Sequence, residues 1–266
     1  MTRIDFHLGT RSWGMHAMIG DGIFTQDGNE WKGSRDILRR RFAHMQYQNL
    51  GGFHEHIESM IESLNASGST EVDLQKEFYR LTLNTTIAMI LGRPVENYEG
   101  EIGTIFSASF DEASRVTGTR IRLGDLYYIY CPRGFLKACK TIRDYTYGFV
   151  SRALEAADKD GHDPMKTKSG SFIQDLYDHR PDIGLVRDQV LNILIAGRDT
   201  TAATMSYAFL LLLRHPATFE ALRCEIETVI GSKSDITRAD IQSMPYLHNV
   251  LKESIHHPQL NQSRTI

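Results

Sequence analysis

The sequence has few cysteines, few prolines and almost no net charge. Its 266 residues include 3 cysteines, 7 prolines and a formal net charge of -3. The spacing of Cys131, Cys139 and Cys224 fits neither a zinc site nor a dense disulfide framework, so a reducing compartment is the simpler interpretation, and each is expected to be an ordinary core or surface thiol. A balanced charge gives no reason to expect a nucleic-acid partner.

Uninterrupted apolar runs are also missing. The longest apolar stretch, residues 190–213, has Arg198 and Asp199 at its middle, and two charges there argue against a membrane span. Residues 1–20 lack the apolar centre of a signal peptide. From these absences we expect the chain by itself to be soluble.

The apolar residues that are present recur with helical rather than alternating spacing, which predicts a mainly α fold without a β-rich half. The predicted helices cover residues 29–45, 53–64, 73–91, 102–116, 135–157, 171–177, 185–214, 216–230, 237–244 and 246–256. The polar segment 159–170 is predicted to be a surface loop.

The helix at 185–214 is uncommonly long and is apolar all round in its second half, so it should run through the interior. Its middle reads Ala196-Gly197-Arg198-Asp199-Thr200-Thr201. Ala196 and Gly197 precede the two threonines by one turn, so the four share a face whose small size leaves room for a flat ligand. The threonine hydroxyls can bond to carbonyls one turn earlier, and an acid beside an alcohol can pass protons to a bound oxygen species. The alternative is close helix packing in a core.

Several motifs, in the same order, resemble cytochromes P-450. Residues 191–201 resemble the oxygen-binding segment of that family's central helix, and Arg214-His215-Pro216 resembles its end. Residues 245–254 and the stretch from Gly20 to Arg35 resemble two further family segments. The resemblance covers nearly the whole chain and is strongest to the fungal branch that hydroxylates alkanes and fatty acids.

The resemblance implies a haem cofactor and a monooxygenase that inserts one oxygen atom of O2 into a long alkyl chain. Asp199 and Thr200 would be catalytic, Thr200 towards bound oxygen and Asp199 in proton delivery, while Ala196 and Gly197 would lie against haem. Electrons would come from NADPH through a cytochrome reductase. Residues 102–135, with Phe106, Phe110 and Leu126, would line the substrate channel or would simply be core. No separate metal site is expected. The family location is the cytosolic face of the endoplasmic reticulum membrane, through an anchor expected to lie outside this chain.

Trp31 and Arg35 are four residues apart and face the same way on a helix. The resemblance implies that the pair reaches a haem propionate, and an indole N–H and a guanidinium are both suitable donors. The alternative is a half-buried tryptophan packed on an arginine. Arg264 resembles a family arginine at the other propionate. The basic run from Arg39 to Arg41 is either a solvated face or a docking patch for an acidic electron donor.

The sequence departs from the family pattern in its last part. His256 stands where the family's Glu-x-x-Arg, beginning here at Glu253, has its arginine, and the loop Phe-x-x-Gly-x-Arg-x-Cys-x-Gly has no counterpart. We therefore expect a single incomplete domain over residues 1–266, without the axial cysteine, the haem-loop part and most β structure. The alternative function is an inactive truncated helical remnant that cannot ligate haem iron. The histidines at positions 54, 56, 248, 256 and 257 are expected to serve surface or packing roles.

Overall fold

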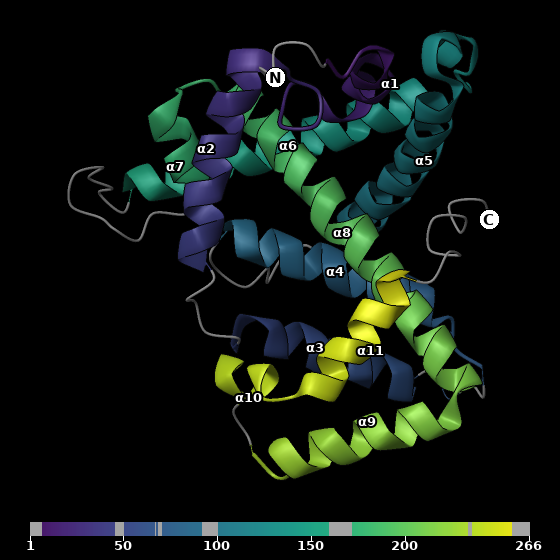
Figure 1. Cartoon of the computed structure of the whole chain (residues 1–266). Coiled ribbons are helices and arrows are strands. Elements are labelled where there is room, and N and C mark those ends of the chain that lie inside the picture. The colour runs from purple at the N-terminus through teal and green to yellow at the C-terminus, as the bar shows by residue number, and fades with distance from the viewer. Residues whose placement is uncertain are drawn as a thin grey trace, which may run out of the picture. The chain divides into compact units, whose positions relative to one another are not determined.

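The computed structural model describes residues 7–45, 51–66, 68, 71–91, 101–159, 172–233 and 236–256. Within these ranges the chain is helical and contains no strand, as the apolar spacing predicts (Figure 1). The helices are α1 (Thr10–Ile19), α2 (Gly28–Met45), α3 (Gly51–Ala66), α4 (Leu74–Leu91), α5 (Glu101–Leu123), α6 (Phe135–Lys159), α7 (Phe172–His179), α8 (Ile183–Arg214), α9 (Pro216–Val229), α10 (Arg238–Gln242) and α11 (Pro245–His256), with a 3-10 helix η2 (Gly124–Ile129).

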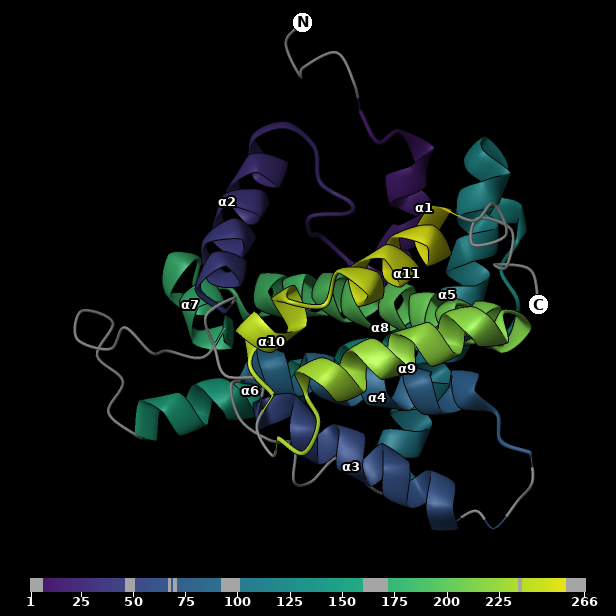
Figure 2. The ribbon, with the colours of Figure 1, turned by 60° about the horizontal axis from the view of Figure 1, so that its bottom comes forward.

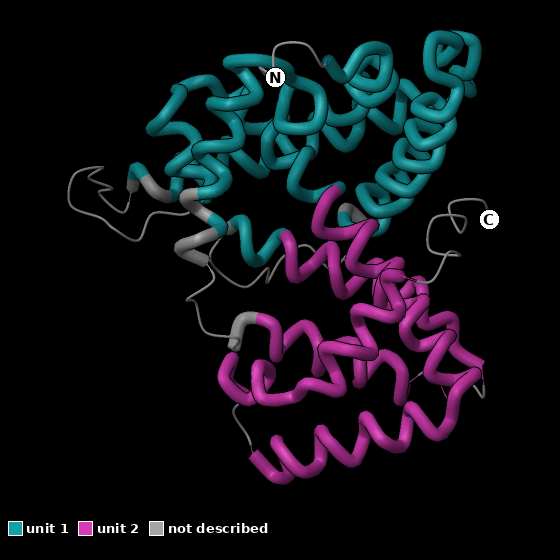
Figure 3. The backbone as a smooth tube through the Cα atoms, viewed as in Figure 1, with its two compact units in different colours: residues 1–47, 87–195 teal, residues 48–86, 196–266 magenta. Residues whose placement is uncertain are grey.

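The chain divides into two compact units, shown in teal and magenta in Figure 3. Unit 1 comprises residues 1–47 and 87–195, and unit 2 comprises residues 48–86 and 196–266. The helices α4 and α8 each contribute residues to both units. The expectation of one family domain over residues 1–266 stays a prediction.

Unit 1 is built around the packing of α5 on α6, with α1 and η2 against α5 and with α7 against α6. Its core includes Phe110, Phe135 and Ile142, which are fully buried. The rings of Phe42 and Phe172 lie 6.5 Å apart and join α2 to α7, which Figure 2 shows close to one another. This packing leaves the first half of α8 enclosed, since Val190 and Leu191 have no exposed surface.

Unit 2 contains α3, most of α4, the second half of α8 and the helices α9, α10 and α11. The rings of Phe78 and Phe209, 5.3 Å apart, join α4 to α8. Figure 2 shows α9 and α11 side by side. Glu225 on α9 accepts hydrogen bonds from the backbone N–H groups of Tyr246 and Leu247 at 2.9 Å each. A carboxylate at this end of α11 satisfies two N–H groups that have no partner within the helix and complements the positive end of its dipole.

The predicted helices are confirmed, with shifted ends. The largest shift is in α5, which was predicted to end at residue 116 and continues to Leu123. Two short elements were missed: α1, between Gly9 and Gly20, and η2. Most of the predicted loop at 159–170 lies outside the described residues. No helix of the described part is long and apolar enough to cross a membrane.

Candidate functional site

The two parts of the expected haem site belong to different units, so each is described by itself. Ala196 to Thr201 lie in unit 2, and Trp31 with Arg35 lies in unit 1. Arg264 lies outside the described residues, and its expected contact with a propionate stays a prediction.

The turn from Ala196 to Thr200 is partly accessible. Ala196 is half-buried and Thr200 is exposed. The hydroxyl of Thr200 donates a hydrogen bond to the Ala196 carbonyl at 2.6 Å, which confirms the predicted bond to the preceding turn. The same pattern follows at Thr204, whose hydroxyl donates to the Thr200 carbonyl at 2.8 Å. Because the Thr200 hydroxyl donates its only proton within the helix, its lone pairs remain as acceptors on the accessible side.

Gly197 faces α4 rather than open space. A Cβ atom placed on Gly197 would lie 2.6 Å from Oγ1 and 2.9 Å from Cγ2 of Thr86. The glycine therefore allows α4 and α8 to approach each other closely, which is the packing reason left open by the sequence. The sequence predicted one open face formed by the four small residues from Ala196 to Thr201. Thr86 fills the Gly197 side of that face, so only part of it is open. The assignment of Gly197 as a cofactor-binding residue stays a prediction.

Arg198 is a buried cation on the α4 side of the same turn. Its residue is 2 % exposed, its guanidinium lies 4.7 Å from the centroid of the Tyr79 ring, and it donates to Asp199 Oδ1 at 2.9 Å. The Arg198 carbonyl accepts a hydrogen bond from the Thr82 hydroxyl at 3.1 Å. Burying a guanidinium is costly unless a carboxylate and further polar or aromatic groups surround it. These contacts hold the Asp199 carboxylate in a defined position beside Thr200.

Trp31 and Arg35 form a pair on α2, as their spacing predicts. Both side chains are half-buried, and the Arg35 guanidinium lies 5.6 Å from the centroid of the Trp31 ring. No carboxylate of the described residues forms an ion pair with Arg35. A half-buried guanidinium without such a partner, held against an indole, is chemically suited to grip the carboxylate of a bound cofactor. The donor set of α2 therefore fits a haem propionate.

The approach to α2 is held by polar residues of α8 that the sequence did not single out. Asn192 is fully buried, accepts from the backbone N–H of Phe24 at 3.0 Å and donates to the carbonyl of Ile19 at 3.1 Å. Asp188, with its side chain 8 % exposed, accepts from the N–H of Asp21 at 3.0 Å and forms an ion pair with Arg187. The sequence signal that could have identified Asn192 and Asp188 is the presence of polar residues in an apolar, buried helix, because buried polar groups need specific partners.

Glycines make this anchoring possible. At Gly20 a Cβ would collide with the Asp188 carboxylate, and at Gly22 it would collide with the Asn192 amide. Gly20 also has a φ of +62°, a conformation that glycine adopts at little cost. Together these contacts fix the segment from Gly20 to Gln26, which leads directly into the helix that carries Trp31 and Arg35.

The residues proposed to line the substrate channel have different surroundings. Phe110 has no exposed surface and its ring lies 5.8 Å from that of Phe106, which in turn contacts Tyr145. Leu126 is 51 % exposed. Phe110 is therefore a core residue of unit 1, and channel lining stays a prediction.

The cysteines have the surroundings of ordinary thiols. Cys131 and Cys224 are exposed and Cys139 is buried. Burial raises the pKa of Cys139 to about 12, so this thiol stays protonated at neutral pH and is a poor metal ligand. No group of three or more His, Cys, Asp or Glu side chains suited to a metal ion occurs in the described part of the chain.

The remaining candidates lie at the surface. Arg39 is exposed, while the side chains of Arg40 and Arg41 are outside the described set. His54 lies 3.9 Å from Glu58 in an exposed pair, and His56 and His248 are half-buried. Glu253 and His256, the departure from the family pattern, are both exposed on α11.

Comparison with known proteins agrees with the motifs. The model of the family described as Cytochrome P450 matches residues 8–259. Cytochrome P450 52A13 of Debaryomyces hansenii is 32% identical over 270 residues, which cover 94% of this chain and 51% of that protein. A cytochrome P450 of Arthroderma benhamiae is 36% identical over 242 residues, which cover 88% of this chain and 48% of that protein. This chain thus spans about half the length of these relatives.

Solved structures show the same fold. The crystal structure of the cytochrome P450DA heme domain superposes with a TM-score of 0.70 at 18% sequence identity, covering 91% of this chain and 51% of that one. At that identity the likeness shows the fold alone, and the family model and the fungal relatives carry the assignment. The helical order, the motif of α8 and these matches agree, and this chain belongs to the cytochrome P450 family.

Proposed function

We propose that this protein is a haem-dependent monooxygenase that inserts one oxygen atom of O2 into a long-chain alkane or fatty acid. Membership in the cytochrome P450 family supports haem and oxygen chemistry. The alkyl-chain substrate rests on the resemblance to the fungal branch and on similarity to fungal 52A proteins. We propose NADPH and a cytochrome reductase as the electron source, and the cytosolic face of the endoplasmic reticulum membrane as the location.

The observation that carries the proposal is the turn from Ala196 to Thr200. Its accessible hydroxyl is already oriented by the bond to the Ala196 carbonyl, so it needs no reorganisation to accept a hydrogen bond. The neighbouring Asp199 carboxylate is held by Arg198 at 2.9 Å. An oriented hydroxyl beside a fixed carboxylate can hold and pass protons towards an oxygen atom bound on this side of α8.

Haem, when bound, supplies oxygen activation and the oxidising chemistry. We propose that Arg35 and Trp31 hold one of its propionates and that Arg264 contacts the other. We propose that Ala196, whose side chain is small, also lies against haem, while Gly197 permits the close packing of α8 on α4. The role of this chain's residues is then to bind the cofactor, orient the substrate and guide protons.

The proposal is tested by supplying the haem-loaded protein with NADPH, a cytochrome reductase and either dodecane or dodecanoic acid. Hydroxylated product that depends on both NADPH and O2 is expected. Absence of product together with absence of a carbon monoxide difference spectrum on reduction would contradict the proposal and favour the inactive helical remnant.

Thr200→Ala tests the proton-guiding role. It removes the oriented hydroxyl at an exposed position and should lower hydroxylation on the order of 10²-fold, the usual size of an acid–base contribution. Thr204→Ala, one turn further along α8, removes a hydroxyl with the same internal bond and serves as the control. Equal losses in the two variants would show that Thr200 has no special role.

A further inference from the structure

The helix α2 has few buried side chains. Among its described residues only Ser34 and Leu38 are buried. The packing of Leu38, like that of the Phe42 ring on α7, is apolar and not directional, so it holds the helix without fixing its rotation about its own axis. The exposed ion pair between Glu30 and Arg180 adds only a weak contact. Hydrogen bonds are directional, so those of Ser34 are suited to set this rotation.

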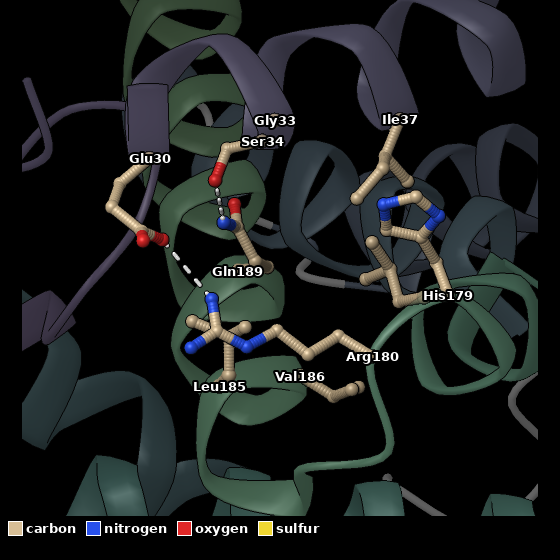
Figure 4. Close-up of a pocket in the computed structure, with 10 residues that line it drawn as sticks. Glu30, Gly33, Ser34, Ile37, His179, Arg180, Leu185, Val186 and Gln189 are labelled. Carbon is tan, nitrogen blue, oxygen red and sulfur yellow. Dashed lines mark hydrogen bonds and ion pairs between the residues drawn. The ribbon is translucent and has the colours of Figure 1, made fainter. Parts of the chain in front are cut away.

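The Ser34 hydroxyl joins α2 to two other segments. The amide nitrogen of Gln189 on α8 donates to this hydroxyl, as the dashed line in Figure 4 shows, and the hydroxyl donates in turn to Gln26 Oε1 at 2.6 Å. Gln26 ends the segment that Asp188 and Asn192 hold against α8. Gln189 is 4 % exposed, and hydrogen bonds in such surroundings are stronger than at the surface. One buried hydroxyl thus ties α2 both to α8 and to its own approach.

Ser34 is close, around the helix, to the pair proposed to grip haem. Successive residues of an α-helix are about 100° apart, so Trp31 lies about 60° and Arg35 about 100° from Ser34, on the same side. Both are half-buried, at the edge of the face that Ser34 turns towards α8. A rotation of about 20° would move side chains at a radius of about 5–6 Å by about 2 Å. Binding groups need to be held within roughly 0.5 Å and 10–20°, so this rotation would misalign the guanidinium.

We infer that Ser34, Gln189 and Gln26 are positioning residues, whose hydrogen bonds set the rotation of α2 and thereby aim Trp31 and Arg35 at a haem propionate. None of the three touches the cofactor in this arrangement. All five residues belong to unit 1. This role rests on the proposed haem contacts, so the orientation of α2 and the retention of haem are measured separately.

The orientation of α2 is measured without haem, by acrylamide quenching of Trp31 fluorescence in full chain that carries Trp13→Phe. The chain has two tryptophans, so this background reports on Trp31 alone. Ser34→Ala removes both hydrogen bonds and should shift the quenching constant, because the half-buried indole turns with its helix. Ile142→Val, a mild loss of packing at a fully buried position of α6, should leave the constant unchanged. An unchanged constant in folded Ser34→Ala protein, judged by circular dichroism, would overturn the inference.

Gln189→Leu tests whether the three residues act as one chain. It lies on α8 and should shift the Trp31 quenching constant in the same direction as Ser34→Ala. Adding Ser34→Ala to Gln189→Leu should produce little further shift, since both changes break the same chain of bonds. Additive shifts would show that the two residues act independently and would contradict the inference.

Transfer of haem to apomyoglobin tests what the orientation is for. Ser34→Ala should speed haem loss by about tenfold or more, the size expected when a hydrogen bond to a charged group is lost. Arg35→Lys should add little to Ser34→Ala, because the misaimed guanidinium has already lost its contact, but should keep its full effect in Ile142→Val protein.

Two outcomes separate this role from the haem contacts themselves. Multiplicative effects of Ser34→Ala and Arg35→Lys would show that Ser34 acts only on stability, which overturns its positioning role. If Arg35→Lys alone leaves haem loss unchanged while Ser34→Ala shifts Trp31 quenching, the proposed haem grip is wrong and only the orientation of α2 by Ser34 stands.

Discussion

At the scale of single residues, two glycines in helix interiors have opposite surroundings. Gly197 lies against Thr86, whereas Gly33 faces open space. In the sequence both are glycines inside predicted helices, and the loss of helix stability expected from each is the same. Only the residues packed across from each glycine show that Gly197 is needed for close helix approach and that Gly33 is not.

Gly197→Ala is therefore expected to lower the free energy of unfolding by up to about 2 kcal/mol. Overpacking costs about 1–3 kcal/mol, which exceeds the gain of about 1 kcal/mol in helix propensity. Adding Thr86→Ala should recover part of the loss by removing the two atoms that collide. Gly33→Ala is the matched control and should raise stability. Urea denaturation of the three variants and the wild type measures these effects, and equal effects at the two glycines would contradict the role of Thr86.

The buried thiol of Cys139 is expected to lower the free energy of unfolding at alkaline pH. Burial raises its pKa from 9.0 to about 12, so the folded state keeps this proton when the unfolded chain has released it. The stabilising contribution is fully present below pH 9 and is lost as the pH rises towards 12, with a slope of at most about 1.4 kcal/mol per pH unit.

The contribution is measured as the difference in unfolding free energy between wild type and Cys139→Ala at pH 8 and at pH 10. The difference should shrink at the higher pH, because the variant lacks the titrating thiol. Cys224→Ala, at an exposed thiol, should follow the wild type at both pH values. A difference that does not change with pH would show that Cys139 titrates normally.

At the scale of elements, the longest helices were the easiest to predict. The helical spacing of apolar residues placed α8 within two residues at its start and at the correct end, Arg214. The missed helix α1 is only 10 residues long and contains Gly14. Gly14 packs against the backbone of Ile121, and its carbonyl accepts a hydrogen bond from Arg120 at 3.4 Å. The helix α1 depends on tertiary contacts with α5, which the local sequence pattern does not show.

The segment from Gly20 to Gln26, which precedes α2, likewise depends on tertiary contacts, in this case with α8. Asn192→Leu removes the acceptor for the Phe24 N–H and the donor to the Ile19 carbonyl. Each buried group left without a partner costs about 1–3 kcal/mol, so a clear loss of unfolding free energy is expected. Hydrogen exchange at the Phe24 amide should accelerate more than exchange in unit 2.

The control for this change is Asn249→Leu, the same substitution at an exposed position of α11. It should alter neither stability nor exchange at Phe24. If Asn192→Leu leaves the Phe24 amide as protected as in wild type, Asn192 does not anchor this segment.

At the scale of the whole molecule, the proposed haem contacts involve residues that are far apart in the chain. Arg35 on α2 is proposed to grip a haem propionate through the two parallel donors of its guanidinium. Arg35→Lys keeps the charge but loses this fork, so haem loss from the loaded protein should accelerate by roughly tenfold or more. Transfer of haem to excess apomyoglobin measures the rate.

Arg39→Lys is the matched control, because Arg39 is exposed one turn further along the same helix. It should leave the rate of haem loss unchanged. Equal rates for the two variants would show that Arg35 does not hold the cofactor, and the alternative of simple packing on Trp31 would then explain the pair.

The sequence by itself determined the helical class, the positions of most helices and the family motifs, because helical periodicity and short motifs are local properties of the chain. The tertiary structure alone decided that Thr86 fills the Gly197 side of α8, that Asn192 and Asp188 hold the approach to α2, and that Gln189 is buried against Ser34. Each of these depends on a partner 100 or more residues away, and the burial that makes an unpaired polar group costly arises only when the helices pack.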